Sequence, residues 1–310
     1  MTTVATPDGV LLVDKPAGVT SHDVVLAARR ATGEKRIGHT GTLDPFATGL
    51  LVLLVGRATR LLPYVESDPK VYDADIAFGA ETDTEDLDGA VTRAADRPSK
   101  TAVLAAVAGL TGDLMQLPSS YSAKRVGGRR AYAIARRGGD PGLVPVPVRI
   151  DEWEPREWRG AEDAIERLVV RITCGGGTYV RALARDLGRA AGSAAHVTAL
   201  RRVRSGAFDV REAQQLGDLS PGPGTLRPPL AAVAHLPRVL ITHTEVASIA
   251  RGISIPAAQP GGRAALVAEG AGVLVAIAEW RAGQWLPRVV MRRADGVDAP
   301  EPDAPEPAAM

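Results

Sequence analysis

The segment Gly38-His39-Thr40-Gly41-Thr42-Leu43-Asp44-Pro45-Phe46-Ala47-Thr48-Gly49 places a single carboxylate, that of Asp44, in a turn rich in glycine and threonine. The apolar run 50–55 follows at once and predicts a buried strand. Pro45 fixes its own φ and biases Asp44 towards an extended backbone. A carboxylate held this rigidly beside a buried strand suits a nucleophile or a general base. The alternative for an Asp-Pro pair is an Asx-turn that caps the strand.

The composition is that of an ordinary globular protein. The chain has 310 residues, of which 45% are apolar and 24% charged, enough for one large domain or two smaller ones. The only cysteine, Cys174, excludes an internal disulfide and a cysteine-based zinc site. No apolar run is long enough to span a bilayer, and the first residues lack the features of a signal peptide. We therefore expect a cytoplasmic protein with no membrane association.

The charge is unevenly distributed along the chain. The formal net charge is +1, but the segment 294–310 holds five acidic residues and no Lys or Arg, which leaves +6 on the rest. Two basic blocks stand out, one at 124–137 and one at 201–204. Such blocks attract phosphate backbones, although either could also be a solvated surface. The acidic run 81–88 offsets them in sum, and we expect it to lie elsewhere in space.

The pattern of elements predicts an α+β fold. Strands are expected at 10–13, 50–55, 71–78, 114–117, 144–150, 167–174 and 197–210, and helices at 20–31, 58–65, 99–110, 129–137 and 178–191. A second unit from about 238 has one short helix, 244–251, and strands near 264–268, 272–279 and 285–291, a pattern that fits a small β-barrel. We place the first domain at 1–236, with 217–230 as its linker. The second domain is placed at 237–293, followed by a disordered acidic tail at 294–310.

Further residues accompany Asp44 as candidates. Arg181 falls in the first turn of a helix, where the helix dipole disfavours a cation. An ion pair with Asp44 would offset this cost and keep the carboxylate charged and oriented. Tyr72 begins an alternating strand and could be core or a stacking platform for a nucleobase. His39 could be a turn residue or could contact nucleic acid. The five histidines show no metal-ligand spacing, so the sequence predicts a single carboxylate that acts without a metal.

Several separated motifs resemble one family. They are 11–16 (Leu-Leu-Val-Asp-Lys-Pro), 38–49, 70–72 (Lys-Val-Tyr), 121–124 (Tyr-Ser-Ala-Lys) with Gly128, Ala131 and Tyr132, 177–181 (Gly-Thr-Tyr-Val-Arg) with 186–188 (Asp-Leu-Gly), and 200–202 (Leu-Arg-Arg). Their order and spacing over residues 10–210 are similar to those of the TruB family of pseudouridine synthases. Ser119-Ser120 departs from the pattern, because many members carry two prolines there.

The resemblance implies a fold and roles for particular residues. The fold is a pseudouridine-synthase domain with a mixed, mainly antiparallel sheet flanked by helices, followed by a PUA-like barrel that binds RNA. Asp44 is the catalytic carboxylate, Tyr72 stacks on the target uracil, and Arg181 pairs with Asp44. Lys15, Tyr179 and Leu200 help line the pocket, and His39 contacts the RNA loop. Residues 124–147 form a mobile insertion that closes over RNA, and the basic residues expected to bind RNA are Lys124, Arg129, Arg130 and Arg202.

The implied activity is isomerisation of uridine 55, in the T-arm loop of tRNA, to pseudouridine by base flipping. The reaction imports no group and changes no redox state, so no cofactor is expected. The expected partner is the T-arm stem-loop, with no obligate protein partner and a monomeric enzyme. Two alternatives stay open: a non-catalytic RNA-binding or tRNA-folding module that uses the same surface, and a guide-RNA-dependent synthase. The basic insertion at 124–147 argues against the second, since an enzyme that acts alone needs its own RNA clamp.

Overall fold

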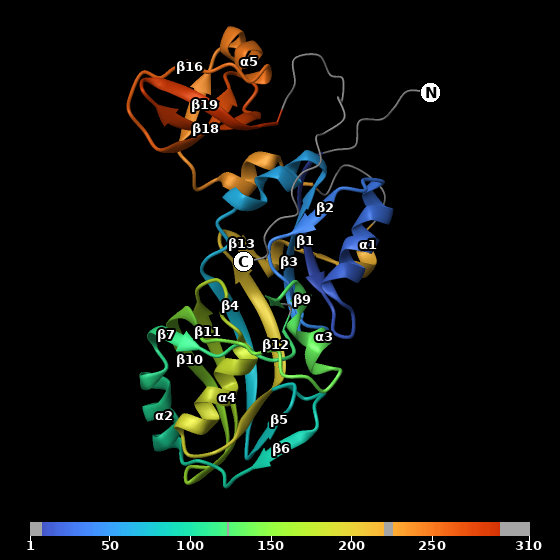
Figure 1. Ribbon diagram of the computed structural model, residues 1–310, viewed down its shortest axis with the longest axis vertical. Helices are drawn as coiled ribbons and strands as arrows, with labels where there is room; N and C mark the ends of the chain where they lie inside the picture. Colours follow the sequence, from blue (N-terminus) through green and yellow to red (C-terminus); the bar gives the residue numbers. More distant parts are fainter. Residues whose placement is uncertain (1–7, 123, 220–225, 292–310) are drawn as a thin grey trace.

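The computed structural model describes residues 8–122, 124–219 and 226–291. Figure 1 shows a long twisted sheet with a smaller sheet stacked beyond one of its ends. The predicted acidic tail 294–310 and part of the predicted linker 217–230 lie outside the described residues. No helix within the described ranges is long and apolar enough to cross a membrane.

The main sheet has ten strands among the described residues and runs in the order β14-β1-β3-β12-β4-β11-β10-β7, with β13 on β12 and β2 on β3. Its strands are β1 (Gly9–Lys15), β2 (Ile37–His39), β3 (Thr48–Val55), β4 (Lys70–Phe78), β7 (Gly112–Gln116), β10 (Val146–Ala161), β11 (Ala164–Cys174), β12 (Ala195–Ser205), β13 (Phe208–Asp209) and β14 (Gln214–Gln215). Only the pairs β1/β14 and β3/β12 are parallel. The expected α+β fold with a mixed, mainly antiparallel sheet is therefore confirmed.

The sheet is covered differently along its length. Helices α2 (Lys100–Gly109) and α4 (Val180–Ala190) lie on one face of β4, β10 and β11 and share a core with them (Figure 1). Around β3 both faces are buried. Leu50, Val52 and Leu54 face one core and Leu51, Leu53 and Val55 face another, which also contains α1 (Ser21–Thr32). Since side chains alternate along a strand, a strand buried on both faces reads as one continuous apolar run.

Local capping signals account for the starts of three helices and for the end of α1. Thr20 caps α1 in a capping box with Asp23, and Gly33 ends the helix in the left-handed region at φ 69°. The helix expected at 58–65 is instead the 3₁₀ segment η1 (Gly56–Tyr64), which contains Pro63. The linker prediction also needs correction, because Arg227 pairs with Val10 of β1 and the chain then forms η5 (Pro229–Val233). Two further 3₁₀ turns are η2 (Val210–Glu212) and η3 (Leu216–Asp218).

The segment after β7 differs from its prediction. The helix expected from Arg129 begins only at α3 (Ala131–Ala135), and the residues before it form a hairpin of β8 (Arg125–Val126) and β9 (Arg129–Arg130). Gly127 and Gly128, both at positive φ, make the two-residue turn that such a hairpin requires. A second hairpin, β5 (Ala80–Thr82) with β6 (Val91–Ala94), carries the acidic run.

The second sheet has the order β15-β17-β18-β19-β16. Its strands are β15 (Arg238–Ile241), β16 (Ile255–Pro256), β17 (Arg263–Ala268), β18 (Leu274–Arg281) and β19 (Gln284–Val290), and Thr242 caps its helix α5 (His243–Ala250). The helix and the three longer strands were predicted, whereas β15 and β16 were not. Among the described residues the sheet is open, with β15 and β16 as its two edge strands, and the PUA-like identity stays a prediction.

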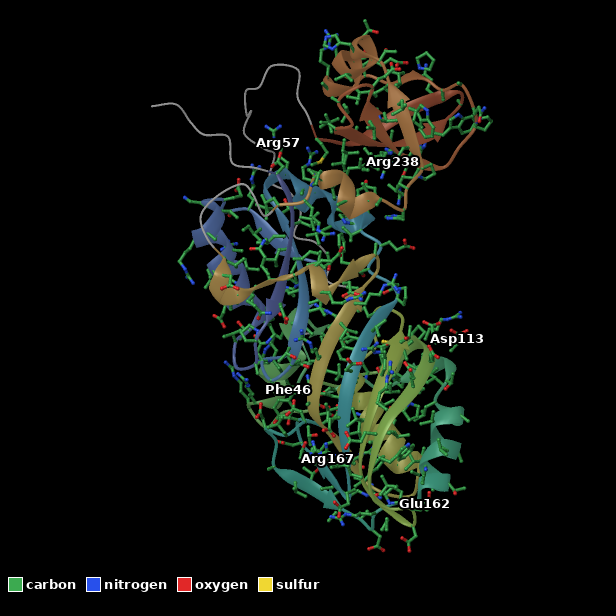
Figure 2. All side chains as sticks on the ribbon, turned by 180° about the vertical axis from the view of Figure 1, so that it is seen from behind. Phe46, Arg57, Asp113, Glu162, Arg167 and Arg238 are labelled. Carbon is green, nitrogen blue, oxygen red and sulfur yellow. The ribbon has the colours of Figure 1, made fainter. Side chains whose placement is uncertain are left out.

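The two sheets share a core. Ala265, Ile277 and Met291 of the second unit pack with η1 and η5 and with Leu12 and Val52 of the main sheet. The Arg60 guanidinium donates to the Val290 carbonyl at 2.9 Å, and that of Arg263 lies 4.9 Å from the Tyr64 ring centre. In Figure 2, Arg57 and Arg238 mark the two sides of this junction. The second unit therefore packs directly against one end of the main sheet.

Candidate active site

A small pocket of about 90 Å³ opens beside Asp44. It is formed by the Asp44 loop, by β4 and β12, and by the N-terminal end of α4. Its lining residues are Thr42, Leu43, Asp44, Tyr72, Thr178, Tyr179, Val180, Arg181 and Leu200. Figure 2 labels Phe46, from the same loop, near the middle of the molecule's long axis. Of the residues predicted for the site, Asp44, Tyr72, Arg181, Tyr179 and Leu200 are thus brought together.

The Asp44 loop is held in place from behind by α1 and β1. The buried hydroxyl of Ser21 donates to the Leu43 carbonyl at 3.0 Å and accepts from the Leu43 N–H at 2.9 Å. The Lys15 ammonium donates to the carbonyls of Pro16, Val19 and Pro45 at 2.9, 2.8 and 3.2 Å. Together these bonds fix the backbone on both sides of Asp44.

Lys15 does not line the pocket as predicted. Lys15 is fully buried behind the loop, where the three carbonyls accept from all three N–H donors of its ammonium group. Burial lowers the pKa of Lys15 to about 8, and the nearby Asp44 carboxylate opposes part of this effect. Its place in the structure is that of a support for the loop.

Arg202 also departs from its prediction. It is only 1% exposed and donates from Nε to the Leu50 carbonyl at 2.8 Å and from Nη2 to the Gly41 carbonyl at 3.0 Å. Its backbone also presses against Gly49, which has φ 101° and no room for a side chain. Arg202 thereby joins the two ends of the loop and, being buried, is not exposed to phosphates. Its neighbour Arg201, on the other face of the strand, pairs with Asp14 at 2.7 Å.

The predicted ion pair between Arg181 and Asp44 is present. Arg181 Nε donates to Asp44 Oδ2 at 2.9 Å, with the arginine side chain 5% exposed and the aspartate side chain 33% exposed. The remaining bonds of the guanidinium go to the carbonyl of Thr84 at 2.6 Å, the hydroxyl of Ser119 at 3.2 Å and the carbonyl of Tyr121 at 3.0 Å. Asp44 Oδ1 has no bonding partner within the described part of the chain. One carboxylate oxygen is thus anchored and the other is open to chemistry.

The acidic run lies against α4, where three arginines project at four-residue intervals. Arg181 Nη1 lies 3.5 Å from Asp86 Oδ2, Arg185 forms a buried ion pair with Glu85, and Arg189 pairs with Glu81 at 2.6 Å. Tyr121 donates its hydroxyl to Asp83 at 3.2 Å. The acidic run therefore neutralises the arginines of α4 rather than remaining an isolated surface.

The aromatic residues of the pocket are held as neutral phenols. Burial raises the pKa of Tyr72, with the Arg202 charge opposing it, and the residue is 7% exposed. Burial likewise raises the pKa of Tyr179. Leu200 from β12 adds an apolar surface. The pocket thus combines one accessible carboxylate with two ring systems and an aliphatic side chain, a lining that suits a planar heterocycle.

Gln116 fixes the start of α4. The buried side-chain amide of Gln116 accepts from the Tyr179 N–H at 2.9 Å and donates to the Tyr179 carbonyl at 3.2 Å. Tyr179 is the N-cap residue and makes no side-chain cap of its own. Sequence reasoning missed Gln116, Ser119 and Ser21, because each acts on a residue far away in the chain. The only available signal was that each lies close to a motif: Ser21 follows the capping Thr20, and Gln116 and Ser119 precede Tyr121.

The other candidates are not among the residues that line the pocket. His39 is in β2, half-buried and paired with Leu53. In the basic insertion Lys124 is half-buried and Arg129 is exposed, and the side chain of Arg130 lies outside what the structure describes. Within the described residues no group of three His, Cys, Asp or Glu side chains is arranged to hold a metal ion.

Two family models match the chain. A model for the TruB family pseudouridylate synthase (N terminal domain) covers residues 29–180, and a model for the tRNA pseudouridylate synthase B C-terminal domain covers 181–221. The matched region contains the whole Asp44 loop, Tyr72 and the α4 arginines. Neither match extends to the second sheet.

Curated relatives match over most of the chain. The tRNA pseudouridine synthase B of Mycobacterium bovis (strain BCG / Pasteur 1173P2) is 45% identical over 256 residues, 82% of this chain and 86% of its own. That of Leifsonia xyli subsp. xyli (strain CTCB07) is 40% identical over 281 residues, 88% of this chain and 93% of its own.

Solved structures share the fold. The chain superposes on one from the archaeal box H/ACA sRNP Nop10-Cbf5 complex with a TM-score of 0.67 at 24% identity, covering 93% of this chain and 87% of that one. A second match, with a TM-score of 0.65 at 22% identity, comes from an H/ACA RNP bound to a substrate RNA containing 2'-deoxyuridine and covers 92% of this chain and 84% of that one.

Proposed function

The chain belongs to the TruB family of pseudouridylate synthases, a family of isomerases, and on that premise we propose that it converts uridine 55 in the T-arm loop of tRNA to pseudouridine. The observation that carries the proposal is the Asp44 carboxylate, which is anchored through Oδ2 by Arg181 and lines the same pocket as Tyr72. The names of the relatives support tRNA as the substrate.

The reaction needs a carboxylate and no imported group. The N1–C1′ bond breaks, the uracil turns, a C5–C1′ bond forms, and the proton lost from C5 is balanced by one gained at N1. Asp44 Oδ1 would act on the sugar or the base as a nucleophile, or as the base that accepts a proton. Arg181 would keep the carboxylate aimed at the pocket throughout.

The uridine must leave its stack before it can enter the pocket. Extrusion of a loop nucleotide costs a few kcal/mol. Stacking on an aromatic ring returns about 1–3 kcal/mol, and Tyr72 offers such a ring. Since burial raises the pKa of Tyr72, its phenol remains protonated near neutral pH and can donate a hydrogen bond but is a poor base. We assign proton removal to Asp44 for this reason.

The remaining RNA contacts are proposed outside the pocket. Arg129 and Lys124, in the insertion 124–147, would contact phosphates together with Arg130, and His39 would meet the RNA loop. The second sheet would serve as a PUA-like RNA-binding unit after the catalytic domain. The enzyme would act as a monomer in the cytoplasm, without an obligate protein partner or a guide RNA.

Asp44→Asn tests the proposal. The amide oxygen can still accept from Arg181, so the fold and the affinity for a T-arm stem-loop should stay within about twofold, while the nucleophile or base is lost. We expect no pseudouridine by mass spectrometry or carbodiimide mapping. Asp113→Asn, on the exposed strand β7, is the matched control and should keep full turnover.

Wild type and Asp44→Asn together separate the proposed function from the RNA-folding module and from the guide-RNA-dependent synthase. Substantial turnover by Asp44→Asn contradicts the proposed role of the carboxylate. If wild type makes no pseudouridine but both proteins accelerate tRNA folding equally, the chain is an RNA-folding module. If product forms only after a guide RNA is added, the stand-alone reading is wrong.

A further inference from the structure

Ser119 occupies an unusual place beside the Arg181–Asp44 pair. It follows β7, it is fully buried, and its hydroxyl accepts from Arg181 Nη1 at 3.2 Å and from the Tyr121 N–H at 3.3 Å. Burial raises the pKa of the nearby Glu85 carboxyl. The two bonds engage both acceptor positions of this hydroxyl.

We infer that Ser119 is a positioning residue for the isomerase reaction, holding the Arg181 guanidinium at the angle from which Nε addresses Asp44. The inference rests on the function proposed above. It concerns a residue that touches neither the pocket nor the RNA-binding surface, since Ser119 is not among the pocket-lining residues and is closed to solvent.

The geometry of arginine makes this indirect action possible. A guanidinium is planar and its N–H groups point in fixed directions. Bonds at Nη1 and Nη2 therefore set the direction of the Nε–H that reaches Asp44. Ser119 and Thr84 hold Nη1, and Tyr121 holds Nη2. Removing one of these anchors lets the plane rotate without breaking the ion pair outright.

The backbone of Glu85, which lies on the same side of α4 as Arg181 and Arg185, is an independent observation about this region. It has φ 63°, a left-handed conformation that is costly for a residue other than glycine. In that conformation its side chain is buried and forms an ion pair with Arg185. The strained backbone is maintained where it pairs a buried carboxylate with Arg185, one turn of α4 beyond the Arg181 that Ser119 holds.

Ser119→Ala is the test, with Ser120→Ala as the matched control. Ser120 is the next residue, half-buried, and its hydroxyl makes no bond within the described residues. Single-turnover pseudouridine formation on a T-arm stem-loop is followed over a range of protein concentrations. We expect Ser119→Ala to lower the rate constant at saturation about tenfold, the size of one lost hydrogen bond to a charged group. The half-saturating concentration should change less than twofold, and the thermal midpoint less than about 4 °C.

Three outcomes would overturn the inference. One is a saturated rate for Ser119→Ala equal to that of wild type. Another is a loss confined to the half-saturating concentration, since Ser119 would then order the RNA-binding insertion instead. The third is an equal loss in Ser120→Ala, which would point to the turn as a whole. A wild-type protein that forms no pseudouridine would sink the proposed function itself, a result distinct from these three.

Discussion

Arg202→Met separates two roles for an arginine that the sequence assigned to RNA and the structure buries. As an RNA ligand, Arg202 would contact a phosphate. As a support, it ties the Gly41 and Leu50 carbonyls together across the Asp44 loop. Methionine keeps much of the aliphatic length and removes both sets of donors. The two roles predict opposite results for stability and for the salt dependence of binding.

The expected magnitudes follow from the two contacts. Each buried carbonyl left without a donor costs about 1–3 kcal/mol, so we expect Arg202→Met, which frees two of them, to lower the free energy of unfolding by about 2–6 kcal/mol. Each phosphate contact adds about 0.7–0.9 to the slope of log K against log salt concentration. A guanidinium that is 1% exposed contributes nothing to that slope. The slope should therefore be unchanged in the variant.

Two assays on the same protein preparations give these numbers. Urea unfolding measures the stability, and titration of a T-arm stem-loop at several salt concentrations measures the slope. Arg129→Gln is the comparison, because Arg129 is exposed in the basic insertion. We expect Arg129→Gln to keep wild-type stability and to reduce the slope of log K against log salt concentration by about 0.7–0.9, the contribution of one phosphate contact.

The reasoning is refuted by the reverse result. If Arg202→Met unfolds at the wild-type urea concentration and its slope falls by nearly one, then Arg202 leaves its carbonyls and reaches the RNA. The loop would in that case need another support between Gly41 and Leu50.

Two further predictions concern pH. Burial lowers the pKa of Lys15 from 10.5 to about 8, so between these pH values the unfolded chain keeps a proton that the folded chain has released. The unfolding free energy of wild type should therefore rise with pH relative to that of Lys15→Met. Urea unfolding of both proteins at pH 7.5, 9 and 10 measures this difference, and a constant difference would contradict the prediction. Hydrogen bonds from Arg189 and Arg93 lower the pKa of Glu81 against the effect of burial. The stabilisation that the Glu81 carboxylate gives is therefore present above its ordinary pKa of 4.5 and disappears as the pH falls through the lowered pKa. Glu81→Gln should be less stable than wild type at pH 7 and should approach wild-type stability in acid; a stability difference that persists at pH 3 would exclude these ion pairs as its source.

Local features of the sequence were sufficient for much of the frame. The capping box at Thr20, the apolar run of β3 and the alternation that buries Tyr72 in β4 all depend on neighbours within a few residues. The ion pair of Arg181 with Asp44 was also predictable, because a cation in the first turn of a helix calls for a compensating charge. These predictions needed no knowledge of which strands pair.

Elements stabilised by distant partners could not be predicted in the same way. Residues 151–161 are rich in charge and contain Pro155, and the sequence predicted strand only to Ile150, yet β10 continues to Ala161. Pairing with β11 outweighs the low strand propensity, and the ladder shifts register around Pro155. The fate of the acidic run was likewise set by α4, about one hundred residues away.

The paired arginines show where sequence reasoning could have gone further. Adjacent residues of a strand point to opposite faces, so Arg201 and Arg202 could not both face the same partner. Arg201 is partly exposed and pairs with Asp14, whereas Arg202 is buried. Alternation alone predicts that the two differ. Which one is buried depends on the parallel pairing of β12 with β3, which places Arg202 beside Gly49.

The charges around the pocket explain why Oδ1 of Asp44 is left without an arginine partner, unlike the carboxylates of the acidic run that lie nearest to α4. The acids of the 81–88 run nearest to α4 face arginines, Glu81 with Arg189, Glu85 with Arg185, and Asp86 near Arg181. Asp44 shares Arg181 with Asp86, but only Oδ2 of Asp44 is engaged. Since the helix arginines are already matched to the acidic run, none of them has a spare charge to cover Oδ1. The ion pairs between α4 and the acidic run therefore also leave Asp44 Oδ1 uncovered, and on the proposed mechanism substitutions in these pairs should lower the rate of pseudouridine formation without removing any RNA contact.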